Sequence, residues 1–111
     1  MDKAGRIKKE LKRLNEIYRS TPEGHKATLE GLIKNTAWLR VTIEDAQADI
    51  DLNGSTEKFQ QAKGMEPYDR KRPIADQLDK WNSQYRNNIK ILVEHVPEQD
   101  AKDELEEFLK Q

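Results

Sequence analysis

Apolar residues recur at helical spacing over the second half of the chain, between residues 73 and 96. Every third or fourth position there is apolar, which places these side chains on one face of an α-helix. The stripe consists of Ile74, Leu78, Trp81, Tyr85, Ile89, Leu92 and Val96. We predict a long helix in this segment, with the stripe packed against another helix.

A second helical pattern of apolar positions runs over residues 22–52. The sequence at 20–23 has the form of a capping box, and Asn53-Gly54 supplies a glycine where a helix ends in the left-handed conformation. Two long helices joined in this order predict an antiparallel hairpin. The first is about 45 Å long at ~1.5 Å per residue, so we expect it to protrude or to pack along a neighbouring molecule.

Shorter helical patterns flank this hairpin on both sides. Residues 3–19 carry one apolar face, formed by Ile7, Leu11, Leu14, Ile17 and Tyr18. After Pro97, an acidic segment carries apolar residues at helical spacing, namely Ala101, Leu105, Phe108 and Leu109. The predicted fold is all-α: a basic helix at 1–20, a helical-hairpin oligomerisation core at 21–96 and an acidic helix at 97–111.

Within the core, residues 53–72 lose the helical period and contain Gly64 and Pro67. Loops longer than about 12–15 residues are usually functional or disordered. We predict an irregular polar loop here, and a short turn of helix at 56–62 is the alternative. Disorder is the other interpretation for this loop and for the two ends of the chain.

The composition changes this picture by favouring self-association. Hydrophobic residues make up 34% of the 111 residues and charged residues 37%, whereas globular domains average about 45–50% and about 25%. Such a chain has a thin core, so we expect a homo-oligomer that buries more surface between copies. The predicted oligomer interface consists of Trp38, Leu78, Trp81, Tyr85, Ile89 and Leu92. The alternative is that they form an ordinary core within one chain.

Several classes of function are disfavoured by what the sequence lacks. There is no cysteine, and no apolar run approaches the ~20 residues that a membrane span needs, so we expect a cytosolic protein that binds no membrane. The histidines, His25 and His95, lie in different predicted helices without partners at the spacing of a metal or nucleophile motif. We therefore predict a protein that is not an enzyme and uses no cofactor or metal.

The charges are sorted by sign along the chain, although the net charge is only −1. Residues 1–20 carry seven basic and three acidic side chains, and residues 94–111 carry two basic and seven acidic ones. Blocks of opposite sign indicate separate electrostatic partners, or contact with each other. The candidate phosphate contacts are Lys8, Lys9, Lys12, Arg13, Arg70, Lys71 and Arg72. The alternative is that these groups are only solvated.

The acidic end is a candidate docking segment, in which Leu105, Phe108 and Leu109 would enter a groove on a partner. Folding back onto the chain's own hairpin is the alternative.

Three segments of the sequence carry a resemblance to a known family. They are Ala37-Trp38-Leu39-Arg40-Val41-Thr42-Ile43-Glu44-Asp45, Asn53-Gly54, and Glu66-Pro67-Tyr68-Asp69-Arg70-Lys71-Arg72-Pro73. Together they resemble the small terminase subunits of tailed bacteriophages, in particular the group from phages and prophages of Gram-positive bacteria. The likeness covers roughly residues 7–100. It implies an all-helical ring in the host cytosol that binds double-stranded viral DNA and passes it to the large terminase subunit, which holds the ATPase and nuclease.

Two other interpretations compete with this resemblance. One is a structural or regulatory coiled-coil protein without a nucleic-acid role, and the other is a small protein whose acidic helix imitates DNA. The chain also lacks a clear helix-turn-helix, so sequence-specific reading of DNA bases is not predicted.

Overall fold

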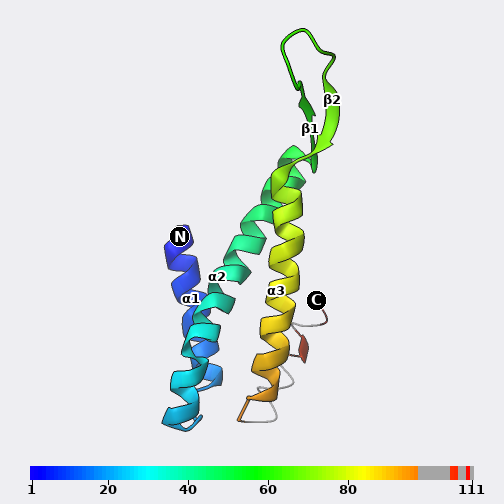
Figure 1. The fold of residues 1–111 in the computed structure, drawn as a ribbon. Helices are drawn as coiled ribbons and strands as arrows, with labels where there is room; N and C mark the ends of the chain where they lie inside the picture. Colours follow the sequence, from blue (N-terminus) through cyan, green and yellow to red (C-terminus); the bar gives the residue numbers. More distant parts are fainter. Residues whose placement is uncertain (98–105, 108–109, 111) are drawn as a thin grey trace.

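The fold is mostly helical, with three helices and one small β-hairpin (Figure 1). The computed structural model describes residues 1–97, 106, 107 and 110. In chain order the elements are α1 (Lys3–Ile17), α2 (Glu23–Asn53), β1 (Thr56–Phe59), β2 (Tyr68–Lys71) and α3 (Pro73–Glu94).

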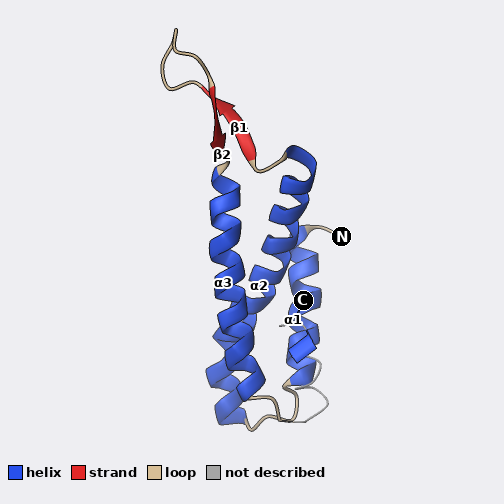
Figure 2. Cartoon of the chain, turned by 90° about the vertical axis from the view of Figure 1, so that its right-hand side faces the viewer, coloured by secondary structure: helices blue, strands red, loops and turns tan. Residues whose placement is uncertain are grey.

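The long helices α2 and α3 lie side by side and antiparallel, which confirms the predicted helical hairpin (Figures 1 and 2). Helix α1 packs against α2 at the end far from the β-hairpin. The strands extend from the opposite end, where α2 finishes and α3 begins. The molecule measures 64 × 26 × 22 Å, and the C-terminal part of α2 extends beyond α1, as the sequence predicted (Figure 1).

The core lies where the three helices meet, and each contributes residues at the spacing that the sequence indicated. Its buried members are Leu14, Tyr18, Leu29, Ile33, Ala37, Ile89 and Leu92. The Tyr18 hydroxyl donates a hydrogen bond to the backbone carbonyl of Leu92, which joins the end of α1 to the end of α3. The predicted stripe on α3 is therefore largely covered within one chain.

The helix boundaries follow local chemistry, with one prediction wrong. Asp2 caps α1 by accepting a hydrogen bond from the Gly5 backbone N–H at 2.8 Å. The sequence placed the N-cap of this helix at Ser20, but α2 begins at Glu23 with Pro22 in the N-cap position. Pro22 disfavours the helical conformation at the residue before it, so Thr21 is a poor first residue for the helix.

The prediction of an irregular loop at 53–72, and with it a strictly all-α fold, is wrong. Strands β1 and β2 form an antiparallel two-stranded sheet over this segment. The facing pairs are Thr56 with Lys71, Glu57 with Arg70, Lys58 with Asp69, and Phe59 with Tyr68. Two of these pairs join opposite charges and one joins two aromatic rings, which are the combinations that stabilise neighbouring strands.

The predicted acidic helix at 97–111 falls mainly outside the described residues. Its docking candidates Leu105, Phe108 and Leu109 all lie outside them.

Candidate nucleic-acid interface

The outer face of α1 gathers basic side chains around a shallow hollow. Lys8, Lys9 and Lys12 line it together with Lys26 from α2, and its volume is about 780 Å³. Lys8, Lys9 and Lys12 are all exposed. Leu11 adds an apolar group and Glu16 an acidic one, so the lining is mainly basic and partly apolar.

Helical periodicity explains why these lysines share one face. Lys8 and Lys12 are four residues apart and therefore neighbours on the helix surface, whereas Leu14 and Tyr18 point into the core. Within residues 1–97, no ion pair involves Lys8, Lys9 or Lys12. Their charges are therefore available to an anionic partner.

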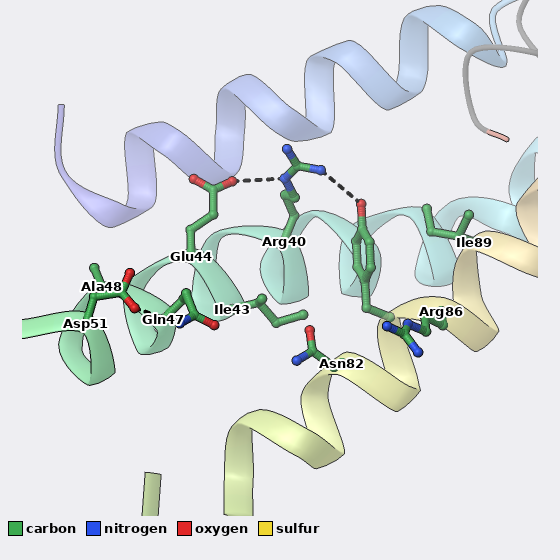
Figure 3. Close-up of a pocket in the computed structure, with 10 residues that line it drawn as sticks. Arg40, Ile43, Glu44, Gln47, Ala48, Asp51, Asn82, Arg86 and Ile89 are labelled. Atoms are coloured by element: carbon green, nitrogen blue, oxygen red, sulfur yellow. Dashed lines mark hydrogen bonds and ion pairs between the residues drawn. The ribbon is translucent and has the colours of Figure 1, made fainter. Parts of the chain in front are cut away.

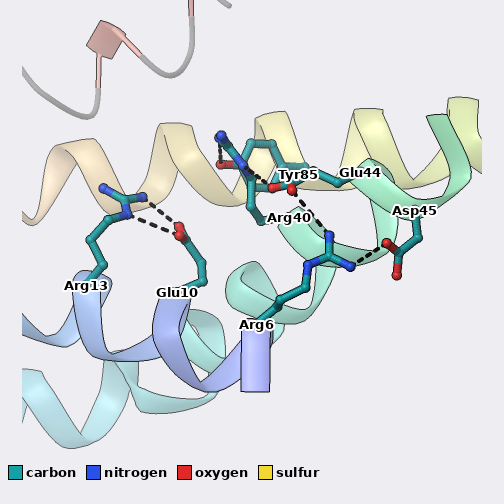
Figure 4. Close-up of polar contacts among 7 residues, drawn as sticks. All are labelled: Arg6, Glu10, Arg13, Arg40, Glu44, Asp45 and Tyr85. Carbon is teal, nitrogen blue, oxygen red and sulfur yellow. Dashed lines mark hydrogen bonds and ion pairs between the residues drawn. The ribbon is translucent and has the colours of Figure 1, made fainter. Parts of the chain in front are cut away.

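Arg13, the fourth N-terminal candidate, does not belong to this face. Its guanidinium is bound to the Glu10 carboxylate, with Nε at 3.1 Å and a terminal nitrogen at 2.6 Å (Figure 4). A bidentate pair of this kind fixes the arginine in place and neutralises much of its charge. Three of the four N-terminal candidates are thus brought together, and one is engaged elsewhere.

The second basic cluster is also engaged inside the chain. Arg70 pairs with Glu57 across the β-hairpin at 2.9 Å. Lys71 pairs with Asp76 at 2.9 Å and with Asp79 at 3.4 Å, both on α3. Successive strand residues also point to opposite faces of a sheet, so this cluster does not form one patch.

Arg72 secures the base of the β-hairpin to α2. Its guanidinium donates to the Gly54 carbonyl at 2.7 Å and to the Asp49 carboxylate at 3.0 Å. Hydrogen bonds from Asn53 and then from Arg72 lower the pKa of Asp49. The role of Arg72 in the folded chain is therefore structural.

Three of the predicted interface residues are buried in the chain's own core. Leu78, Ile89 and Leu92 are covered where α3 packs against α2, and Ile89 and Leu92 share a core cluster with Leu14 of α1. A second copy therefore cannot reach them in this conformation. For these three residues, the structure therefore agrees with the alternative that the sequence left open, an ordinary core within one chain.

Two aromatic candidates remain near the surface. Trp38 on α2 is 38% exposed and meets Trp81 of α3 edge to face, with ring centroids 5.9 Å apart. The ammonium group of Lys3 lies over the Trp38 ring, 5.2 Å from its centre. This cluster and the partly buried Tyr85 are the predicted interface residues that a neighbouring molecule can still contact.

A polar network missed by the sequence analysis joins all three helices (Figure 4). From α1, Arg6 reaches Asp45 at 2.6 Å and Glu44 at 3.3 Å on α2. Glu44 also accepts from Arg40 at 2.9 Å, and Arg40 donates to the hydroxyl of Tyr85 on α3 at 3.5 Å. The four-residue spacing of Arg40 and Glu44 was a readable signal for one pair, whereas the contacts to α1 and α3 depend on the fold.

Next to this network, a groove of about 460 Å³ runs between α2 and α3 (Figure 3). Its lining combines apolar residues, Ile43, Ala48 and Ile89, with charged residues that include Arg86 and Asp51.

Among the described residues, no group of three or more histidine, cysteine, aspartate or glutamate side chains is placed to hold a metal ion. The rings of His25 and His95 meet edge to face, with centroids 6.1 Å apart. In the part of the chain that the structure describes, no helix is both long and apolar enough to span a membrane.

Comparison of the chain with protein-family models, with curated proteins and with solved structures finds no match.

Proposed function

We propose that this protein is a non-enzymatic DNA-packaging adaptor of the small-terminase-subunit kind. It assembles as a homo-oligomeric ring, binds double-stranded DNA and recruits the large terminase subunit in the host cytosol. The observation that carries the proposal is the lysine face of α1, where Lys8, Lys9 and Lys12 are exposed and make no ion pair within residues 1–97.

This face suits contact with the phosphate backbone. Lysines bind phosphates as flexible point charges, and each contact releases condensed counterions. The binding is therefore independent of base sequence and sensitive to salt. The proposed DNA contacts no longer include Arg70, Lys71 and Arg72. Their ion pairs join the two strands to each other and join the β-hairpin to α2 and α3.

The acidic end provides the contact with the motor in this proposal. Residues 94–111 carry seven acidic and two basic side chains, and a run of one sign steers association with a basic surface. Leu105, Phe108 and Leu109 are the proposed apolar anchors of this contact.

Charge reversal on α1 tests DNA binding. In Lys8→Glu/Lys12→Glu, affinity for a labelled duplex should fall more than tenfold. The slope of log affinity against log salt should shrink by about 2, because each lost phosphate contact removes roughly 0.9. The matched control is Lys63→Glu/Lys80→Glu, which changes the net charge equally at exposed positions away from α1.

Fluorescence anisotropy over a series of salt concentrations measures both quantities. Equal losses in the two variants would reduce the effect to overall charge. Unchanged binding in the α1 variant would remove this face from the proposal.

The alternative function is that of a structural or regulatory helical protein without a nucleic-acid role. It is favoured by the burial of Leu78, Ile89 and Leu92, since a chain that covers its own apolar stripe needs no ring. The same titration separates the two, because this alternative predicts no retention of duplex DNA by the wild-type protein at low salt.

A further inference from the structure

The β-hairpin stands beyond the ends of α2 and α3, with each strand paired on one side only (Figures 1 and 2). An isolated two-stranded sheet is marginally stable in water, and its edges present unpaired backbone groups. The four residues of β2 are all exposed, with Tyr68 at 49%. The β-hairpin therefore has two open edges that can pair with another strand.

The hydrogen-bonding pattern identifies which backbone groups face outward. The Arg72 N–H donates to the Ser55 carbonyl at 2.8 Å, which makes these two residues a hydrogen-bonded pair at the base of the hairpin. Such pairs alternate along an antiparallel ladder, so every second residue directs its N–H and C=O to the free edge. The outward-facing residues are Thr56 and Lys58 on β1, and Asp69 and Lys71 on β2.

These two free edges complement each other. If β2 of a second copy lies along the outer edge of β1 in the register found inside the hairpin, the outward-facing residues hydrogen-bond to one another. The side chains then repeat the same favourable neighbours: Glu57 beside Arg70, Lys58 beside Asp69, and Phe59 beside Tyr68. The stack of Arg70 on Phe59, 3.6 Å from the ring centre, lies on the face that this pairing would extend.

Pairing of like edges is disfavoured. Two β1 edges can be joined by outward-facing groups, near full overlap, only in registers that set Glu57 against Glu57 or Lys58 against Lys58. Two β2 edges set Asp69 against Asp69 or Arg70 against Arg70. Like charges directly opposite each other destabilise a strand pair. The sequence of the β-hairpin thus favours a head-to-tail contact, β1 to β2, over a two-fold contact between two like edges.

We propose that the β-hairpins of neighbouring copies join edge to edge, β1 of one copy to β2 of the next, in an antiparallel sheet. The inference rests on the self-association in the proposed function and specifies the surface that produces it. A head-to-tail contact repeats from copy to copy and closes into a ring when the rotation between copies permits.

Single cysteines test the pairing directly, because the chain contains none. Thr56→Cys mixed with Lys71→Cys should give a disulfide-linked dimer under mild oxidation, and neither variant alone should do so. Facing residues of neighbouring antiparallel strands lie within the span that a disulfide bridges. The control for random collision is Thr56→Cys mixed with Lys80→Cys, because Lys80 is an exposed position on α3 away from the strands.

Charge exchange gives a second test that needs no cysteine. Glu57→Arg alone and Arg70→Glu alone each place like charges together, both within and between copies, so each should lose assembly. An equal mixture restores opposite charges between copies while the pair within each copy stays broken. The mixture should therefore regain the native mass in light scattering.

Absence of cross-linking above the control, cross-linking by Thr56→Cys alone, or a mixture no larger than its components would overturn the edge pairing. A wild-type protein that is oligomeric and binds DNA, but fails these tests, rejects only this inference. If the wild-type protein is a monomer and does not bind DNA, the proposed function is rejected as well.

Discussion

Tyr18 shows at the scale of one residue how the short helix α1 is held in place. Its side chain is fully buried, and its hydroxyl donates to the Leu92 carbonyl at the far end of α3. Burial raises the pKa of Tyr18, because the phenolate would lose its hydration in the core. The same group therefore ties the fold to pH.

We expect the free energy of unfolding to fall at alkaline pH because of Tyr18. Its folded pKa lies above the ordinary value near 10, so its stabilising effect is complete below pH ~10. That effect is lost as the pH rises from there toward the folded pKa, since the unfolded chain releases its proton first. Urea unfolding over a pH series measures this slope.

Tyr18→Phe should flatten that slope and lower stability by about 1–3 kcal/mol at neutral pH, since the Leu92 carbonyl loses its donor. Tyr68→Phe, at a half-exposed position of the hairpin, is the control and should keep the slope. An alkaline loss that persists unchanged in Tyr18→Phe would contradict the assignment.

At the scale of elements, the long periodic segments could be predicted and the short ones could not. Helices α1, α2 and α3 begin and end within two residues of the predicted bounds, because an apolar face of many turns is a strong signal. Strands β1 and β2 have four residues each and little apolar alternation. Their pairing depends on charges that face each other only after the chain has turned.

The candidate site was predictable to a similar extent. The shared face of Lys8, Lys9 and Lys12 follows from helical spacing alone. The ion pairs of Arg13 and Arg72 do not follow from it. Glu10 is spaced along the helix to pair with either Arg6 or Arg13, and Asp49 is distant from Arg72 along the chain. Whether a basic residue is available depends on the carboxylates that the fold brings to it.

The packing of α3 against the other two helices predicts unequal effects of two isoleucines on it. Ile89 is fully buried in the core, whereas Ile91 is 44% exposed. Ile89→Ala should lower the free energy of unfolding by about 2–5 kcal/mol, the usual range for a buried aliphatic side chain. Ile91→Ala should change it by less than about 1 kcal/mol. Chemical unfolding measures both, and equal losses would show that α3 does not pack in this way.

At the scale of the whole molecule, different parts carry different tasks. Helix α1 and the β-hairpin lie toward opposite ends of the molecule (Figure 1). Helix α1 carries the lysine face, and the β-hairpin has two open edges. In the proposed ring, the edges join the copies and the lysine faces repeat around the assembly. Many weak phosphate contacts then act together, which raises the overall affinity without any new contact.

Sedimentation velocity of the wild-type protein, with and without a labelled duplex, measures both assembly and DNA binding. The proposed function predicts an oligomer without DNA. With DNA it predicts a single faster species in which the duplex carries several copies, and high salt should release the duplex. A monomer at high protein concentration, sedimenting apart from the duplex even at low salt, would contradict it.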